Sequence, residues 1–360
     1  NHGVVDAAAL QRFCTQVLEN SGLLPEHAET VSRNLVDADL RGISSHGVSR
    51  LRYYVEKIRS GGFNVRPQLH IVREGPAYAV VDADNAPGAV AGVYAMDLCT
   101  RKARESGVAL VTVFGGNHYG YAGFYSKRAI EQDMIGFSGC NTPAKVAVHG
   151  GADSVLGTNP FSYAVPADCA QPLLFDGATS VVARGKLLRA FMTGEPIEEG
   201  WAIDAEGFPA RNAEDALAGS LLTFGEHKGS GLSILIEVLS VLLSGAELSV
   251  NSGEIFSDPA RPQKIGFFFG AIDIGHFADP AQFKRRVDTL SGVLRSGRHR
   301  DGCEEILMPG EIETRNELRQ HASGIAIAFD VWNELCAFQR ELEIDDGPFR
   351  VGSAFQECEL

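Results

Sequence analysis

Short β-type runs alternate with helical segments in the first half of the chain, and this alternation limits the fold more than any other feature. Residues 78–82, 108–114 and 134–138 are short and apolar, and helical patterns at 92–106 and 121–132 separate them. Strands separated by helices of this length are typical of an α/β domain. The run Lys264-Ile-Gly-Phe-Phe-Phe-Gly-Ala-Ile-Asp273 predicts a further, deeply buried strand.

Both ends of the chain are predicted to be helical, because apolar residues recur there at spacings of three and four. A loop-rich stretch at 194–219 leads to an apolar helix that ends at Gly245. With 360 residues the chain exceeds the size at which one core stops growing, about 250–300 residues, so we expect two or three subdomains. The remaining expected helices are 5–23, 28–40, from Ser44 or Ser45 to Arg59, 280–296 and 330–342.

The charge balance narrows the class of ligand. A net charge of −14 argues against a nucleic-acid surface, and it makes any local cation informative, because an anion bound here needs concentrated positive charge. The longest apolar stretch, 232–243, contains Glu237 and is shorter than the roughly 20 residues that span a bilayer. Seven scattered cysteines without a C-x-x-C pair, and no signal peptide, predict reduced thiols in the cytoplasm, with no membrane attachment.

His46, Arg50 and Tyr54 are four residues apart in Ser44-Ser-His-Gly-Val-Ser-Arg-Leu-Arg-Tyr-Tyr54. On one continuous helix each step of four residues turns by about 40°, so the three side chains would share a face. Such a face suits 2-oxo-acid chemistry, because arginine binds a carboxylate with two hydrogen bonds and histidine protonates the adjacent carbonyl oxygen. A solvated helix face explains the same spacing, and the alternative stays open.

Two further segments place polar side chains after β-type runs. His118 lies in the glycine-rich Gly115-Gly-Asn-His-Tyr-Gly-Tyr-Ala-Gly123, where the backbone can approach a ligand; a hydrogen-bonded loop histidine is the alternative. Asp176 opens Asp-Gly-Ala-Thr-Ser180 after a buried strand and could bind sugar hydroxyls or orient an imidazole. An aspartate that caps the following helix is the simpler explanation of the second segment.

Lys228 stands in Phe224-Gly-Glu-His-Lys-Gly-Ser-Gly231, at the start of the apolar helix. Free amides at a helix N-terminus together with a lysine can bind a pyrophosphate, whereas glycines needed for close packing are the alternative. No P-loop and no G-x-G-x-x-G Rossmann motif occurs, and H-E-x-x-H, G-x-S-x-G and EF-hand patterns are absent. The histidines show no ligand spacing, so no metal site is predicted.

The ordered set of motifs resembles the type-2 malate/L-lactate dehydrogenase family, also called sulfolactate dehydrogenase-like. The resemblance implies a non-Rossmann NAD(P)-binding α/β fold with a mixed sheet, flanked by helical segments from both chain ends. It also implies a homodimer whose interface these end segments help to build. The implied division is a helical domain of 1–74 plus 314–360, a cofactor domain of 75–200 and a third subdomain of 201–313. The stretches that carry the resemblance are Asp39–Gly47 with Arg50 and Tyr54, Gly116–Gly120, Gly157–Pro160, Asp176–Ser180, Ala183–Lys186, His227–Gly231 and Pro309–Glu311.

The resemblance also assigns roles to residues. It implies a hydride transferred between the nicotinamide and C2 of a small 2-oxo or 2-hydroxy acid, with His46, His118 and Asp176 catalytic and Ser45, Arg50 and Tyr54 at the substrate. NAD is the expected cofactor, with NADP as the alternative, because no arginine pair marks a 2′-phosphate site. The implied cofactor contacts are Asn141, Thr142, Asp176, Gly177, Ala178, Thr179, His227, Lys228, Gly229, Pro309, Gly310 and Glu311.

Two departures from the family pattern leave the substrate open. Ala144-Lys145 stands where a second proline usually follows Pro143, and Gly177 replaces a common methionine. The alternatives are a reductase of a cyclic imino-2-carboxylate and, from another class, a catalytically silent nucleotide-binding sensor. A hydrolase using Ser45 and His46 is disfavoured, because neighbours along a helix do not face each other.

Overall fold

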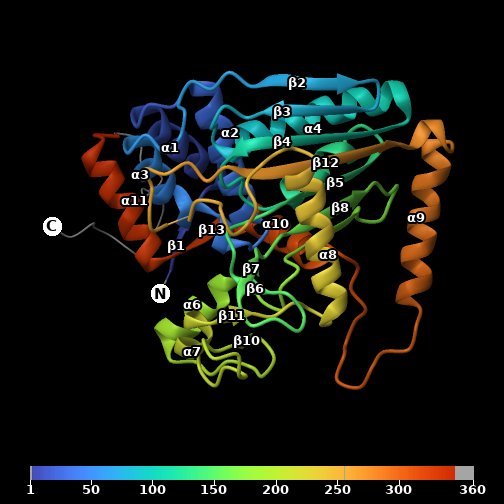
Figure 1. Cartoon of the computed structure of the whole chain (residues 1–360). Coiled ribbons are helices and arrows are strands. Elements are labelled where there is room, and N and C mark those ends of the chain that lie inside the picture. Colours follow the sequence, from blue (N-terminus) through green and yellow to red (C-terminus); the bar gives the residue numbers. More distant parts are fainter. Residues whose placement is uncertain (1, 255, 345–360) are drawn as a thin grey trace.

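A seven-stranded mixed sheet forms the centre of the molecule in the computed structural model, which describes residues 2–254 and 256–344 (Figure 1). Only β3 and β4 run parallel; every other neighbouring pair in this sheet is antiparallel. In spatial order the strands are β2 (His70–Gly75), β3 (Tyr78–Asp82), β4 (Val108–Gly116), β12 (Ile265–Asp273), β5 (Met134–Cys140), β8 (Phe161–Val165) and β9 (Leu173–Gly177).

The buried strand expected from the phenylalanine run is β12, and it occupies the middle of this sheet. Phe267 and Phe269 are fully buried, and β12 pairs with β4 on one side and β5 on the other. The domain division implied by the resemblance places residues 264–273 in a third subdomain, whereas in the structure they form the middle strand of the main sheet. The boundary at residue 74 likewise cuts β2, which is an edge strand of the same sheet.

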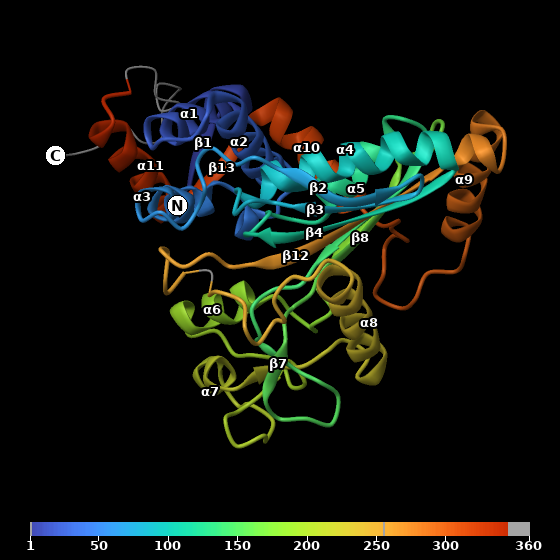
Figure 2. The ribbon, with the colours of Figure 1, turned by 45° about the horizontal axis from the view of Figure 1, so that its top comes forward.

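Helices cover the sheet on both faces. The helices α4 (Gly88–Ser106) and α5 (Gly123–Ile130) pack on one face, whereas α8 (His227–Glu237) and its π-helical continuation (Val238–Leu242) lie on the other (Figure 2). α4 begins before the expected residue 92, directly after Pro87. α9 (Pro280–Arg295) stands at the far end of the sheet (Figure 1).

A helical layer from both chain ends closes the side of the molecule opposite α9 (Figure 1). The strand β1 (His2–Val5) pairs antiparallel with β13 (Ile325–Ala328), which joins the two ends directly. Sequence patterns did not predict this small sheet or α10. Residues 345–360 of the expected helical domain lie outside the described residues. The helices of the layer are α1 (Ala7–Asn20), α2 (Pro25–Leu40), α3 (Leu51–Arg59), α10 (Glu311–Ser323) and α11 (Phe329–Glu341).

A small lobe with its own hydrophobic core lies below the main sheet in the view of Figure 2. Its core includes Val146, Leu187, Trp201 and Leu221, and it gives structure to the stretch expected to be loops. No helix in the described part of the chain is both long and apolar enough to cross a membrane. The lobe's elements are β6 (Val146–Ala147), β7 (Ser154–Leu156), β10 (Ala202–Ile203), β11 (Ser220–Leu221), α6 (Arg184–Thr193) and α7 (Ala213–Ala218).

Candidate active site

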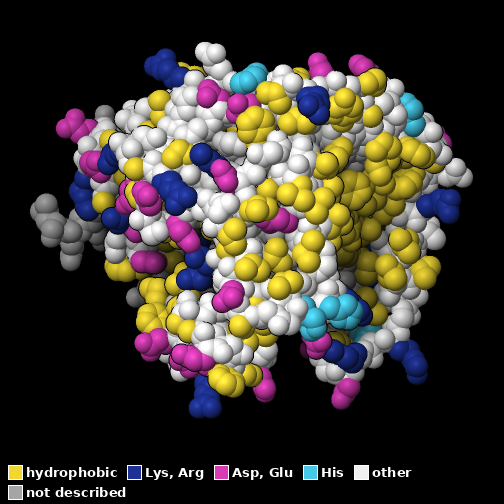
Figure 3. Space-filling view, viewed as in Figure 1, with side chains coloured by type: hydrophobic (Ala, Val, Ile, Leu, Met, Phe, Trp, Pro, Cys, Tyr) yellow, Lys and Arg dark blue, Asp and Glu magenta, His cyan; other side chains and the backbone are white. Residues whose placement is uncertain are grey.

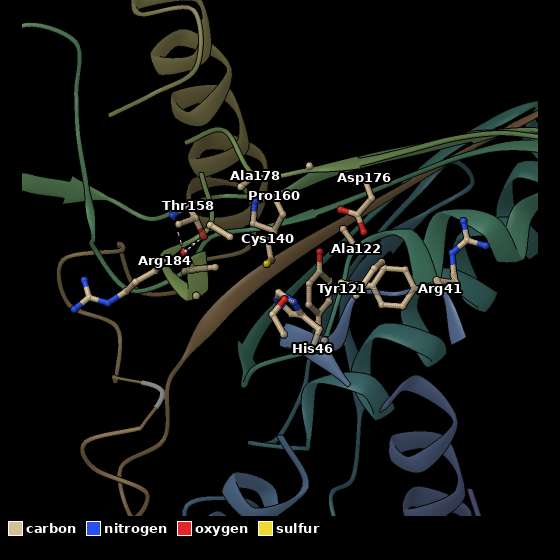
Figure 4. A pocket seen from close by; sticks show the side chains of 18 of the residues that line it. Arg41, His46, Tyr121, Ala122, Cys140, Thr158, Pro160, Asp176, Ala178 and Arg184 are labelled. Carbon is tan, nitrogen blue, oxygen red and sulfur yellow. Dashed lines mark hydrogen bonds between the residues drawn. The ribbon is translucent and has the colours of Figure 1, made fainter. Parts of the chain in front are cut away.

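A cavity of about 700 Å³ lies where the helical layer, the main sheet and the small lobe meet. Its volume is in the range of about 300–1,000 Å³ that is usual for small-molecule sites. In Figure 4, His46 lies in the middle of the cavity, and Arg41 and Arg184 lie at opposite ends. Most of the wall is apolar, and polar side chains are gathered at a few positions.

The segment that carries His46 is not the continuous helix expected from Ser44 or Ser45 to Arg59. Two 3-10 turns, η1 (Ser44–His46) and η2 (Val48–Arg50), precede α3, and the extended residue Gly47 separates them. Asp39, buried near the end of α2, accepts a hydrogen bond from the Val48 amide at 2.7 Å. A Cβ on Gly47 would overlap the Asp39 carboxylate, so glycine is required at this position. The three side chains therefore do not share the face of one helix.

His46 is half-buried in the cavity wall, and its Nδ1 lies 2.9 Å from the Ser45 hydroxyl. Its ring stacks on that of His118, with centroids 5.7 Å apart and planes inclined by 15°. Burial, together with the charge of Arg50, lowers the pKa of His46 to about 4. Without a ligand, His46 is therefore neutral at physiological pH.

Arg50 supplies positive charge beside His46. Its Nε donates to the Ser45 carbonyl at 2.6 Å, and its guanidinium carbon lies 4.7 Å from the centre of the Phe256 ring. Within residues 2–254 and 256–344 no carboxylate pairs with it, and burial lowers its pKa. A cation that is partly desolvated and unpaired is disposed to bind an anionic ligand.

Tyr54 reaches His118 and not the cavity. It is 3% exposed, and its hydroxyl lies 2.7 Å from His118 Nδ1, whereas His118 itself lines the cavity. The His118 amide donates to Gln263 at 2.8 Å, which holds the glycine-rich loop against the start of β12. Tyr54 is therefore placed to support a site residue, in contrast to the substrate contact that the resemblance implied.

Asp176 lies at the end of β9, in the cavity wall. One of its oxygens accepts from the Gly123 amide at 2.8 Å, so it caps α5, which precedes it in sequence, and not a following helix. Burial raises its pKa to about 6 although this hydrogen bond and the charge of Arg41 oppose the shift. Gly177 and Ala178 also line the cavity, whereas Thr179 is buried behind the wall and donates to Thr158.

The remaining expected cofactor residues fall into a lining group and a supporting group. Thr142, Pro309 and Gly310 line the cavity. Asn141 is buried and bridges the Glu247 carbonyl and the Gly266 amide, which supports the wall without lining it. Glu311 likewise turns away: its carboxylate accepts from the Met308 amide and from the side chains of Arg295 and Arg315.

The start of α8 is not part of the cavity wall. His227 and Lys228 are exposed, and the amides of Lys228 and Gly229 already donate to Gly225 and Phe224. A Cβ on Gly229 would overlap the Phe224 carbonyl, so this glycine is needed for packing. For Lys228 and Gly229 the expectation of free amides is wrong, because a tight turn uses them.

Several residues that line the cavity were not predicted as site residues from the sequence. Tyr121 and Arg184 lie inside the motifs 115–123 and 183–186, and their place in these motifs could have identified them. Arg41 lines the far end and pairs with Glu317 at 2.7 Å. Phe256 meets Arg50 only through the tertiary fold, and no local pattern marks it.

The sequence matches the malate/L-lactate dehydrogenase family over residues 5–336. The chain belongs to this family. A malate dehydrogenase from Pyrococcus abyssi is 41% identical over 345 residues, which cover 92% of this chain and 93% of that protein. The solved structure of sulfolactate dehydrogenase from Methanocaldococcus jannaschii has a TM-score of 0.90 at 36% identity, covering 96% of this chain and 98% of that chain.

A third similar protein has a different name. The structure of delta1-piperideine-2-carboxylate reductase from Pseudomonas syringae has a TM-score of 0.83 at 28% identity, covering 93% of this chain and 99% of that chain. These matches confirm the resemblance and the non-Rossmann α/β fold drawn from the motifs. The chain is thus an oxidoreductase of the NAD(P)-dependent 2-hydroxy-acid dehydrogenase class.

Proposed function

We propose that the chain interconverts a small 2-oxo acid and its 2-hydroxy acid, with Arg50 binding the carboxylate and His46 exchanging the proton. The observation that carries this assignment is the unpaired guanidinium of Arg50 in the same cavity as His46. The protein has a net charge of −14, so a partly desolvated cation without a carboxylate partner favours an anionic substrate. Ser45, which contacts both residues, completes the substrate end.

The cavity wall fits a nicotinamide dinucleotide. Apolar residues such as Pro160 and Met308 offer flat surfaces for the rings, and the second oxygen of Asp176 can accept from a ribose hydroxyl. We assign Thr142, Gly177, Ala178, Pro309 and Gly310 to the cofactor on the same ground, since they line this wall. When bound, the cofactor supplies or accepts the hydride at C2 of the substrate.

Substrate binding itself prepares the proton donor. Arg50 is one cause of the low pKa of His46, about 4, and a carboxylate bound to Arg50 would offset that charge. The His46 pKa then rises, the ring takes up a proton, and this proton passes to the C2 oxygen as the hydride arrives at C2. In the oxidative direction neutral His46 removes the hydroxyl proton.

We propose NAD as the cofactor. Asp176 and Glu313 place carboxyl groups in the cavity wall, which suit the ribose hydroxyls of NAD and oppose an added 2′-phosphate. We also propose that the side chain of Lys228, and not its amide, contacts the pyrophosphate of the cofactor. The Phe224 amide donates to the Thr179 carbonyl, which places the start of α8 beside the cofactor segment.

The second candidate function is reduction of a cyclic imino-2-carboxylate, which the match to the Pseudomonas syringae reductase favours. The deciding experiment assays pyruvate, oxaloacetate and Δ1-piperideine-2-carboxylate with NADH and with NADPH. The proposal expects the highest kcat/KM for a 2-oxo acid with NADH. A higher kcat/KM for the imine would identify the chain as an imine reductase instead. NADH binding without turnover of any of these substrates would support a nucleotide-binding sensor.

We also propose a homodimer formed through α8 and α9. Figure 3 shows hydrophobic side chains gathered on this side of the molecule, a larger patch than isolated exposed residues would form. We therefore propose an interface on α8 and α9 instead of the interface on the terminal helices that the resemblance implied. The exposed residues are Ile234, Leu235, Leu242, Leu243, Phe277, Leu290, Val293 and Leu294.

The cytoplasm remains the proposed compartment. The support is chemical, since free thiols persist in a reducing environment. The free cysteines include Cys14, Cys99, Cys140, Cys169 and Cys303.

A further inference from the structure

The hydrogen bonds around His118 define where its proton lies. The Tyr54 hydroxyl is 2.7 Å from Nδ1, and the Gly120 amide donates to the same atom at 3.4 Å. A backbone N–H can only donate, so Nδ1 must hold a lone pair, and the Tyr54 O–H is the second donor to it. A neutral imidazole with an unprotonated Nδ1 carries its proton on Nε2.

The opposite nitrogen is left for a ligand. Nε2 of His118 has no hydrogen-bond partner among the described residues, and the residue lines the cavity in which its ring stacks on His46. The backbone of His118 is held by Gln263, which also accepts from the Tyr53 hydroxyl at 3.2 Å. The ring therefore presents an N–H donor from a fixed loop.

His46 has the opposite kind of partner. Its Nδ1 faces the Ser45 hydroxyl, which can donate or accept, so His46 can gain or lose a proton without losing that bond. His118 faces His46, Arg50, Tyr53 and Tyr54, and none of these carries a negative charge at neutral pH. Burial and the charges of His46 and Arg50 hold its pKa well below the usual range.

We propose that Tyr54 is a positioning residue that keeps His118 as a neutral Nε2–H donor to the C2 oxygen, so that His46 alone exchanges the proton. The inference rests on the proposed function. In the reduction, C2 gains the hydride, its oxygen gains the proton from His46, and His118 keeps its own proton throughout. A preorganised donor of this kind stabilises the negative charge that develops on the oxygen.

Nitrogen NMR of the enzyme labelled with ¹⁵N-histidine tests the tautomer without any substrate. Two-bond ¹H–¹⁵N correlations distinguish protonated from unprotonated ring nitrogens, and the His118→Gln spectrum identifies the His118 signals. The expected result is an unprotonated Nδ1 and a protonated Nε2 that persist from pH 5.5 to 8.5. A protonated Nδ1, or titration of His118 in this range, overturns the proposal.

Kinetics of Tyr54→Phe supply the second readout, with Tyr53→Phe as the matched control because Tyr53 bonds Gln263 and not His118. Tyr54→Phe should mix the two tautomers and lower kcat about tenfold, with KM and the His46 limb of the pH profile unchanged. Tyr53→Phe should leave the tautomer intact. An unchanged kcat in Tyr54→Phe overturns the proposal. Failure of the wild type to reduce any 2-oxo acid rejects the proposed function instead and leaves the NMR test standing.

Discussion

Gly47→Ala tests how the fold places His46. The φ angle of Gly47 is −84°, outside the left-handed region that favours glycine, so the main effect of the substitution is the space that its Cβ needs. Its Cβ would overlap the carboxylate of Asp39, which is buried and holds the Val48 amide. Either the turn between η1 and η2 moves, or Asp39 swings away and leaves that amide without its acceptor.

Both routes have an estimated cost. Overpacking a buried site costs about 1–3 kcal/mol, and leaving a buried amide without its acceptor costs about 1–3 kcal/mol. Because the two routes are alternatives, we expect Gly47→Ala to lower the free energy of unfolding by about 1–3 kcal/mol. A shift of about 1 Å in His46 would also reduce kcat/KM by roughly 100-fold.

Urea unfolding, steady-state kinetics and NADH titration measure the three effects, and NADH affinity should change least. The control is Gly292→Ala in α9, where a new Cβ meets open space and should stabilise the helix by about 0.5–1 kcal/mol. The double variant Gly47→Ala/Asp39→Ala should lose less unfolding free energy than the two single variants lose when their losses are added, because the overlap between the new Cβ and the Asp39 carboxylate is removed. Wild-type stability and activity in Gly47→Ala would refute the role of this contact.

The remaining predictions concern the cavity and the proposed dimer. Arg50→Met should raise the activation free energy derived from kcat/KM for 2-oxo acids by about 2–5 kcal/mol while sparing NADH binding; the exposed Arg52→Met is its control, and equal losses would contradict the assignment. His46→Asn should lower turnover by roughly 10²–10⁴-fold. Because the free His46 has a pKa of about 4 and reduction needs its protonated form, wild-type kcat/KM for reduction should fall about tenfold per pH unit above that value; a profile flat from pH 5 to 7 would count against His46. Lys228→Met should weaken NADH binding, most at low salt, and unchanged affinity removes Lys228 from the cofactor site. Val293→Asp should convert a dimer measured by light scattering into a monomer, and a wild-type monomer would end the dimer proposal.

Local sequence was sufficient for the class of fold and for several strands of the main sheet. Residues 78–82 and β3 coincide, and the strand expected at 264–273 is β12, because runs of apolar residues record burial directly. The motif 39–47 with Arg50 likewise marked residues that line the cavity, among them His46. These signals lie within a few residues, where spacing and side-chain chemistry can be read without knowing the fold.

Tertiary structure alone decided how those pieces combine. Periodicity suggested one helix through His46, but the buried Asp39 and the missing side chain of Gly47 break it into two turns. Tyr54 bonds a residue 64 positions away, and β12 joins the centre of a sheet whose neighbouring strands lie more than a hundred residues earlier. Such contacts depend on the complete packing of the chain, because their energies arise between residues that no local pattern relates.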